Sequence, residues 1–271
     1  MKLLVEISFR GLYYFLTQPN YRRFIGLVLR YGDVRRHQAI KLILHGYRWQ
    51  VPDAASMIWQ YKEIFADNSY SFSSNTAEPV IVDCGSNIGL SCLHYYLHYP
   101  NAKVFAFEPD PLVFKVLTAN VAQLPNYNIS LQQAAVWKEE STLAFYQNDV
   151  DGGSLTTAGS NSKVKVKAID LAAFLSGFEK VDFLKMDVEG AESVLLPHIQ
   201  NQLTKVKNLF IEYHSYPDQK QDLATILRLL EEKGFRYYLM TQNRRPIPLV
   251  NKQTDRLMDY QTNIYAYQTA I

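Results

Sequence analysis

Cysteine is scarce in this chain: Cys84 and Cys92 are the only two among 271 residues. They do not form a C-x-x-C pair, and no second pair accompanies them. Zinc sites and disulfide frameworks need more cysteines at paired spacings. The scarcity argues against both and favours a reducing, cytoplasmic compartment.

Long apolar runs are also missing. Residues 1–16 are apolar in places, but Glu6 and Arg10 interrupt them, and no small-residue cleavage site follows. The segment is too short and too charged to span a bilayer. An amphipathic helix on a membrane surface remains open, although packing of its apolar face against the core or a second subunit is the favoured interpretation.

An excess of one charge is absent overall, since the formal net charge is +2. Residues 1–50 nevertheless hold nine Lys and Arg against only Glu6 and Asp33. Such a segment attracts an anionic partner, for example a phosphate-bearing substrate, a membrane surface or an acidic protein. The alternative is a helix pair with a solvated basic face. No nucleic-acid signal is present, so a nucleic-acid partner is not expected.

The dinucleotide motif G-x-G-x-x-G is absent, and a different glycine turn stands in its place. The β-branched run 80–82 predicts a strand buried on both faces, and a helix is expected over residues 88–97. Between them, Gly85 and Gly89 let a ligand approach the backbone, and the helix presents free N–H groups to the same space. This pattern favours an adenosine-containing cofactor other than NAD or FAD.

A second predicted strand, 103–108, ends in Glu108, followed by Pro109. Glu108 lies about 20 residues beyond the glycine turn, where an acid accepts hydrogen bonds from ribose hydroxyls in nucleotide-binding folds. The alternative is a solvated acid that caps the next helix. Together, the two strand ends favour a single adenosine site.

The rest of the chain predicts one α/β domain with an N-terminal extension. Residues 1–75 are expected to be helical, with apolar residues at helical spacing over 21–44, and residues 68–78 are expected to be a linker. Extended runs near 143–146 and 163–166 predict a β insertion, and the proline-containing stretch 243–259 predicts an antiparallel end to the sheet. Seven strands are expected in a doubly wound sheet, at 80–84, 103–108, 129–136, 181–187, 208–214, 235–241 and 263–269.

Four motifs in this order resemble the FkbM family of S-adenosylmethionine (SAM)-dependent methyltransferases. They are D-C-G-S-N-I-G from Asp83, F-E-P-D-P around Glu108, Q-A-A-V from Gln133, and K-M-D-V-E-G-A-E from Lys185. The resemblance covers residues 79–235. It implies a class I methyltransferase fold: a Rossmann-like, seven-stranded mixed sheet with helices on both faces.

The resemblance also implies the cofactor and the type of reaction. SAM would be bound, and its methyl group transferred to a hydroxyl of a sugar, glycan or natural product, so the expected partner is a small-molecule or glycan acceptor. Asp83 and Gly85 would face the methionine moiety, Glu108 the ribose, and Gln133 or Ala134 the adenine. The predicted cofactor-binding residues are Asp83, Gly85, Ser86, Asn87, Gly89, Leu90, Ser91, Glu108, Pro109, Gln133, Ala134 and Asp187.

A hydroxyl acceptor needs a base, because it is a poor nucleophile at neutral pH. The ends of the predicted strands offer His214, Glu212 and Asp187, in that order of preference, since histidine titrates nearest neutrality and Asp187 could instead orient the cofactor or substrate. Strand alternation places Glu212 and His214 on one face. The carboxylates could also hold Mg²⁺, but their spacing does not demand a metal, and no metal ligands are predicted.

Two further features bear on the acceptor. Residues 151–156 contain paired glycines and are a candidate lid, with an exposed hairpin loop as the alternative. Trp59 and Tyr61 could stack on a sugar or an aromatic acceptor, with a core or interface role as the alternative.

Two other functions compete with methyl transfer. One is an NAD(P)-dependent oxidoreductase with a divergent turn, and the other is a binding module that keeps the fold without turnover. Both remain open from the sequence alone.

Overall fold

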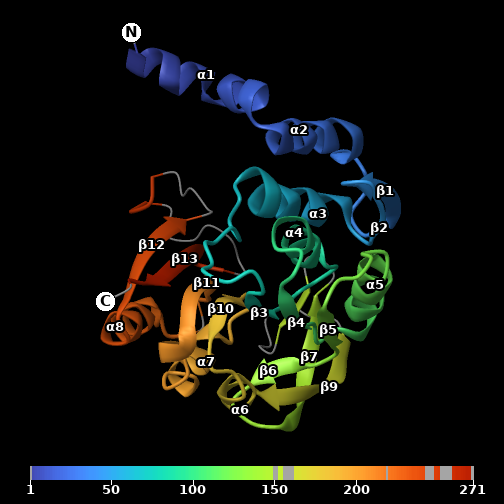
Figure 1. Ribbon diagram of the computed structural model, residues 1–271. Coiled ribbons are helices and arrows are strands. Elements are labelled where there is room, and N and C mark those ends of the chain that lie inside the picture. The colour runs from blue at the N-terminus through green and yellow to red at the C-terminus, as the bar shows by residue number, and fades with distance from the viewer. Residues whose placement is uncertain are drawn as a thin grey trace.

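The computed structural model describes residues 2–148, 152–154, 162–217, 219–241, 247–250 and 258–269 (Figure 1). At its centre lies a seven-stranded sheet of order β12-β13-β11-β10-β3-β4-β5. Neighbouring strands are parallel, except that β13 runs antiparallel to both β11 and β12. The strands are β3 (Val80–Cys84), β4 (Lys103–Phe107), β5 (Ile129–Gln132), β10 (Val181–Met186), β11 (Val206–Ser215), β12 (Phe235–Thr241) and β13 (Tyr260–Gln268).

Helices cover both faces of this sheet. One core joins Ile81 to buried residues of α4 and α5, and the other joins Val82 to buried residues of α6, α7 and α8. Successive residues of β3 therefore point into different cores, which explains its uninterrupted apolar run. The predicted mixed sheet with helices on both faces is confirmed. The helices are α4 (Leu90–His98), α5 (Pro111–Val121), α6 (Leu171–Ser176), α7 (Glu192–His198) and α8 (Leu223–Glu232), and a 3-10 turn, η2, spans Leu203–Lys205.

A second, four-stranded sheet of order β6-β9-β7-β8 lies beside the first (Figure 1). Its antiparallel pair β7 and β9 confirms the predicted β insertion. The single strand predicted over 129–136 is wrong, because it divides into β5 in the central sheet and β6 in the second sheet. The members of the second sheet are β6 (Ala135–Trp137), β7 (Ser141–Asn148), β8 (Gly152–Ser154) and β9 (Ser162–Asp170).

The N-terminal extension is only partly helical. The helix predicted to run over 21–44 ends at Tyr31, and a hairpin follows it. In this hairpin buried and exposed residues alternate along both strands, and its turn residues His45 and Gly46 have φ of +48° and +91°. Two left-handed residues suit a two-residue hairpin turn. The elements are α1 (Lys2–Thr17), α2 (Pro19–Tyr31), β1 (Ile40–Leu44), β2 (Tyr47–Val51), α3 (Ala54–Tyr61) and a π-helix, η1 (Lys62–Ala66).

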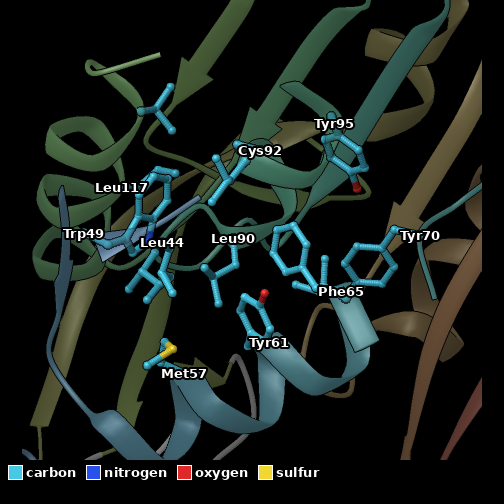
Figure 2. Packing of buried hydrophobic residues seen from close by; sticks show 14 of the residues in the cluster. Leu44, Trp49, Met57, Tyr61, Phe65, Tyr70, Leu90, Cys92, Tyr95 and Leu117 are labelled. Carbon is cyan, nitrogen blue, oxygen red and sulfur yellow. The ribbon is translucent and has the colours of Figure 1, made fainter. Parts of the chain in front are cut away.

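Part of the extension is packed into the core of the sheet domain. Met57, Tyr61 and Phe65 lie on one side of α3 and η1, facing Leu90 and Cys92 of α4 (Figure 2). All five side chains are buried. Residues 54–66 are therefore fixed against the helix that follows the glycine turn. The boundary placed at residue 75 stays a prediction.

Helix α1 extends away from the body, whereas α2 packs on α3 and η1 and buries Phe24 and Leu27 in the core (Figure 1). In α1, Phe9, Leu12, Tyr13 and Leu16 are 52%, 50%, 61% and 65% exposed. These side chains are not packed against the core of this chain, contrary to the first half of the favoured interpretation. Within the described residues, no helix combines the length and apolarity needed to cross a bilayer.

Candidate active site

The glycine turn lies between the ends of β4 and β10. The N–H groups of Gly85 and Ser86 both donate to the Phe107 carbonyl oxygen, at 3.0 and 2.9 Å. Gly85 has a φ of +90°, and a Cβ placed there would lie 2.0 Å from the Asp187 carbonyl oxygen. Only glycine fits this position, because both the left-handed backbone and the close approach exclude a side chain.

Helix α4 begins directly after the turn. Gly89 has a φ of +92°, and a Cβ there would lie 2.8 Å from Leu117 Cδ1. Leu90, a predicted cofactor residue, is buried in the core (Figure 2) and is not among the residues that line the cavity described below. The second glycine and Leu90 thus fix how closely α4 packs on α5.

Asp83 is fully buried, and it does not line the cavity. Ser91 Oγ donates to Asp83 Oδ2 at 2.5 Å, and Lys185 Nζ lies 3.6 Å from Asp83 Oδ1. Lys185 Nζ also donates to the Gly85 carbonyl oxygen at 2.6 Å and to Asp187 Oδ2 at 3.1 Å. Asp83 therefore contacts Ser91 and Lys185, and it supports the glycine turn through Lys185.

Lys185 lines the cavity described below, and the sequence analysis gave it no role of its own. Burial disfavours its charged form, but the carboxylates of Asp187 and Asp83 outweigh this and raise the pKa of Lys185. It is therefore a fixed cation between two strand ends. A lysine in a strand buried at every position could have revealed it, since lysine is rarely buried without a partner.

Glu108 lies beside the turn. Its carboxylate accepts the N–H groups of Asn87 and Asp110, at 3.0 and 2.9 Å, and burial raises its pKa to about 8. A carboxylate has about four acceptor positions, so two remain for ribose hydroxyls. Pro109 is half-buried, Gln133 is exposed and Ala134 is buried. The two acceptor positions left on Glu108 fit the ribose hydroxyls of SAM, whereas the space beside Gly85 is filled by the Asp187 carbonyl oxygen.

A cavity of about 540 Å³ lies at the carboxyl ends of the strands and has two sides. The sheet side consists of residues from the turn and the strand ends. The extension side consists of residues from the N-terminal segment. On the sheet side are Gly85, Ser86, Asn87, Ser91, Lys185, Asp187, Glu189, Glu212, His214, Met258 and Gln261, and on the extension side are Arg36, Ser56, Trp59, Gln60, Lys62, Glu63, Ile64, Asp67 and Tyr70.

The three predicted base candidates meet on the sheet side. Asp187, Glu212 and His214 each offer one donor atom, and these atoms lie within 4.8 Å of one another. Burial, with Asp187 and Glu63 nearby, raises the pKa of Glu212 well above its usual range. Burial disfavours the charged His214, but Glu189, Glu192 and Glu212 outweigh it and raise the pKa of His214 well above its usual range.

Two glutamates of the D-V-E-G-A-E turn face His214. Its Nδ1 lies 3.2 Å from Glu192 Oε1, and its Nε2 lies 3.7 Å from Glu189 Oε2. Glu192 is fully buried, and its Oε1 also accepts the N–H groups of Val188 and Gly190. Glu192 therefore fixes the orientation of the imidazole ring.

The extension side carries residues that no motif indicated. Trp59 is 65% exposed and lines the cavity, whereas Tyr61 is fully buried and lies 3.1 Å from His45 Nε2 through its hydroxyl. Of the two aromatic candidates, Tyr61 therefore belongs to the core. Glu63, in the π-helix, accepts a hydrogen bond from Asn263 at 2.5 Å, and its pKa is raised to about 7 by burial and by Asp187. π-Helices are rare and often occur at functional sites.

The candidate lid at 151–156 lies outside the described residues, apart from Gly152–Ser154, which form β8.

A mixed seven-stranded sheet, a glycine turn and a buried acid at the next strand end define the class: this protein is a SAM-dependent methyltransferase. The family model described as "Methyltransferase FkbM domain" matches residues 83–237. The chain belongs to the FkbM methyltransferase family. The oxidoreductase and the binding module without turnover are thereby set aside.

Three relatives illustrate the similarity. Methyltransferase sdnD of Sordaria araneosa is 31% identical over 211 residues, covering 65% of this chain and 80% of sdnD. Hexuronic acid methyltransferase AglP of Haloferax volcanii is 24% identical, covering 80% of this chain and 90% of AglP. The 2-O-methyltransferase NoeI of Sinorhizobium fredii is 26% identical, covering 50% of this chain and 63% of NoeI.

Proposed function

We propose that this chain methylates a hydroxyl group of a sugar, a glycan or a glycosylated natural product. One observation carries the proposal: a single cavity has Asp187, Glu212 and His214 on one side and the exposed face of Trp59 on the other. Sugar-binding sites combine polar groups with an aromatic face. The relatives named for a hexuronic acid and for 2-O-methylation agree with such an acceptor.

When bound, SAM supplies a methyl carbon on a positively charged sulfur. Transfer to the acceptor would form a bond from the acceptor oxygen to that carbon and break the carbon–sulfur bond, with the electron pair left on sulfur. The chain must hold the acceptor in line and exclude water, which lowers the barrier by several kcal/mol. Gly85, Ser86 and Asn87 line the sheet side of the cavity, where they would hold SAM, and Trp59 on the extension side would face the acceptor.

The hydroxyl proton passes to a base on the sheet side. His214 is the first candidate, because Glu192 holds its ring and its raised pKa makes it a strong base. Glu212 and Asp187 follow in that order. A base must start without its proton, so the rate at saturating SAM is expected to rise with pH through a value above that of ordinary histidine.

Two measurements test the proposal. Calorimetry with S-adenosylhomocysteine (SAH) is expected to show binding, and a panel of cell-extract glycans incubated with methyl-labelled SAM is expected to yield labelled sugars. Label that appears on nitrogen or carbon instead of oxygen would contradict the acceptor assignment without affecting the donor.

We also propose that α1 and α2 dock on an anionic membrane surface on the cytoplasmic side. Leu16 and Leu29 are 65% and 83% exposed, and Arg22, Arg23 and Arg30 lie on α2. Apolar and basic side chains together favour binding to anionic lipid. The double variant Leu16→Ser/Leu29→Ser is expected to sediment less with anionic vesicles than the parent protein. Both proteins are expected to sediment less at high salt than at low salt. Equal binding to neutral vesicles would contradict the proposal.

A further inference from the structure

The geometry points to a divalent-cation site formed by Asp187, Glu212 and His214 at the ends of β10 and β11. We propose that it takes Mg²⁺ or Mn²⁺ and that the cation holds the acceptor oxygen. Two carboxylates and an imidazole, with donor atoms within 4.8 Å of one another, are a donor set that such ions accept. The inference rests on the proposed hydroxyl transfer and refines it.

Glu212 supplies the first independent support. Its side chain is more than nine-tenths buried, since the residue is 7% exposed, and it lines the cavity. It accepts no hydrogen bond from the part of the chain that the structure describes, whereas Asp187 Oδ2 accepts one from Lys185 at 3.1 Å. A buried carboxylate without a donor is costly, so a group that compensates it is expected. A cation in the cavity supplies that compensation.

His214 supplies the second support. Its Nδ1 lies 3.2 Å from the fully buried Glu192, whose Oε1 also accepts two backbone N–H groups. A cation would displace the proton on Nε2, which lies 3.7 Å from Glu189 Oε2, and the neutral imidazole would then donate from Nδ1 to Glu192 and offer the Nε2 lone pair. Histidines that bind metals are commonly held in this way, by a carboxylate on the second ring nitrogen. Glu192 thus completes a carboxylate–histidine–metal arrangement.

The charges around the cavity favour a cation in the same place. On the extension side Lys62 pairs with Asp67 at 2.6 Å, and Arg36 pairs with Asp53 at 2.9 Å. On the described sheet side Lys185 is the only lysine or arginine. It faces Asp187, while Glu189, Glu212 and His214 line the same space, so three carboxyl groups stand against two basic side chains there.

A bound cation would change the role of His214. The ring would ligate the ion, which would orient the acceptor oxygen and favour loss of its proton. The proton would then pass to Glu189, which lines the cavity outside the donor set. Without a cation, His214 remains the base of the proposed function.

Titration of the chelator-treated full chain with Mn²⁺, followed by electron paramagnetic resonance, tests the site without any methyl acceptor. One bound Mn²⁺ per chain is expected, competed by Mg²⁺. Glu212→Gln should weaken binding by more than tenfold, and Glu192→Gln by about 10- to 100-fold through the imidazole. Asp67→Asn is the matched control, because Asp67 lines the same cavity outside the donor set, and its Mn²⁺ affinity should not change.

SAH calorimetry on each variant reports whether it is folded. No Mn²⁺ binding at millimolar concentration, or equal binding by the parent and Glu212→Gln, would overturn the inference. Methyl transfer to a hydroxyl that persists in chelator would leave the proposed function standing without the metal. Mn²⁺ binding with no transfer to any hydroxyl would leave the metal site standing without the proposed function.

Discussion

The sheet side and the extension side of the cavity hold different kinds of residue. The sheet side depends on backbone geometry: Gly85 has no room for a Cβ, and Lys185 ties its carbonyl to Asp187. The extension side depends on individual side chains, such as Trp59 and Glu63, carried by α3 and η1, whose buried residues pack against α4. Donor binding is therefore expected to be intolerant of substitution, and acceptor binding adjustable.

The largest expected effect is on the sheet side. In Gly85→Ala the new Cβ would meet the Asp187 carbonyl oxygen at 2.0 Å, so the turn must move. SAH binding by calorimetry is expected to fall by at least about 100-fold, equivalent to about 2.7 kcal/mol. Gly234→Ala is the matched control: its φ is also positive, at +80°, but no atom lies within 4 Å of its Cβ. Normal SAH affinity in Gly85→Ala would remove the distinction between the two sides.

Two aromatic residues of α3 sharpen the comparison within the extension. Tyr61→Ala should lower the free energy of unfolding by about 3–5 kcal/mol, because the side chain is fully buried. Trp59→Ala should leave stability nearly unchanged but raise the acceptor KM by about tenfold, with SAH affinity intact. Denaturant unfolding and steady-state kinetics measure these effects. An unchanged KM in Trp59→Ala would mean that Trp59 does not contact the acceptor.

Replacing Glu63 tests whether the buried acid on the extension side lowers the free energy of unfolding. Its pKa is about 7 in the folded chain against 4.5 for a free glutamate, so between these values the folded state binds more protons than the unfolded state. Stability is therefore expected to fall as pH rises from 4.5 to 7. Glu63→Gln should lose this fall and be more stable by up to about 3 kcal/mol above neutral pH.

Urea unfolding across this pH range measures the effect of Glu63. Glu78→Gln is the control, since Glu78 is exposed and pairs with Lys103 at 3.2 Å. Its stability should follow the parent at every pH. A Glu63→Gln profile with the parent's slope would show that another group is responsible.

The smallest expected effect concerns Glu108, the predicted ribose-binding residue beside the glycine turn. Burial raises its pKa to about 8, and ribose hydroxyls donate to the ionised form. SAH binding should therefore strengthen as pH rises toward 8, by about threefold in all, because the protonated carboxyl still accepts hydrogen bonds from hydroxyls. Calorimetry on the parent and on Glu108→Gln measures this, and the variant should show a weak, pH-independent affinity. The same slope in both would assign the proton to another group.

The same contrast explains what the sequence could predict. Strands such as β3 and β10 are apolar at most positions, so they could be predicted from the sequence. The motifs at the strand ends then placed Gly85, Glu108 and Asp187 at the carboxyl edge of the sheet. Alternation along β11 correctly put Glu212 and His214 near each other. Tyr61 and Trp59 could not be separated, because only the packing of α3 decides which one faces the core.

Two features of the extension were not predicted. The hairpin has a local sequence signal, and the π-helix has none. The hairpin β1–β2 was missed although residues 40–44 and 47–51 alternate around His45-Gly46, because the apolar residues there also match a helical spacing. The π-helix has no sequence signature. Its inserted residue changes which side chains face the cavity. Glu63 could therefore be placed only by the structure.

Strand β13 determines when the site can be completed during synthesis. It fits between β11 and β12, and its Asn263 holds Glu63, which precedes it by 200 positions. Until the ribosome has delivered β13, β11 has a free hydrogen-bonding edge and Glu63 lacks this partner. A nascent or prematurely terminated chain therefore lacks the Asn263 contact to Glu63 on the extension side of the cavity, even though all four family motifs have already been translated.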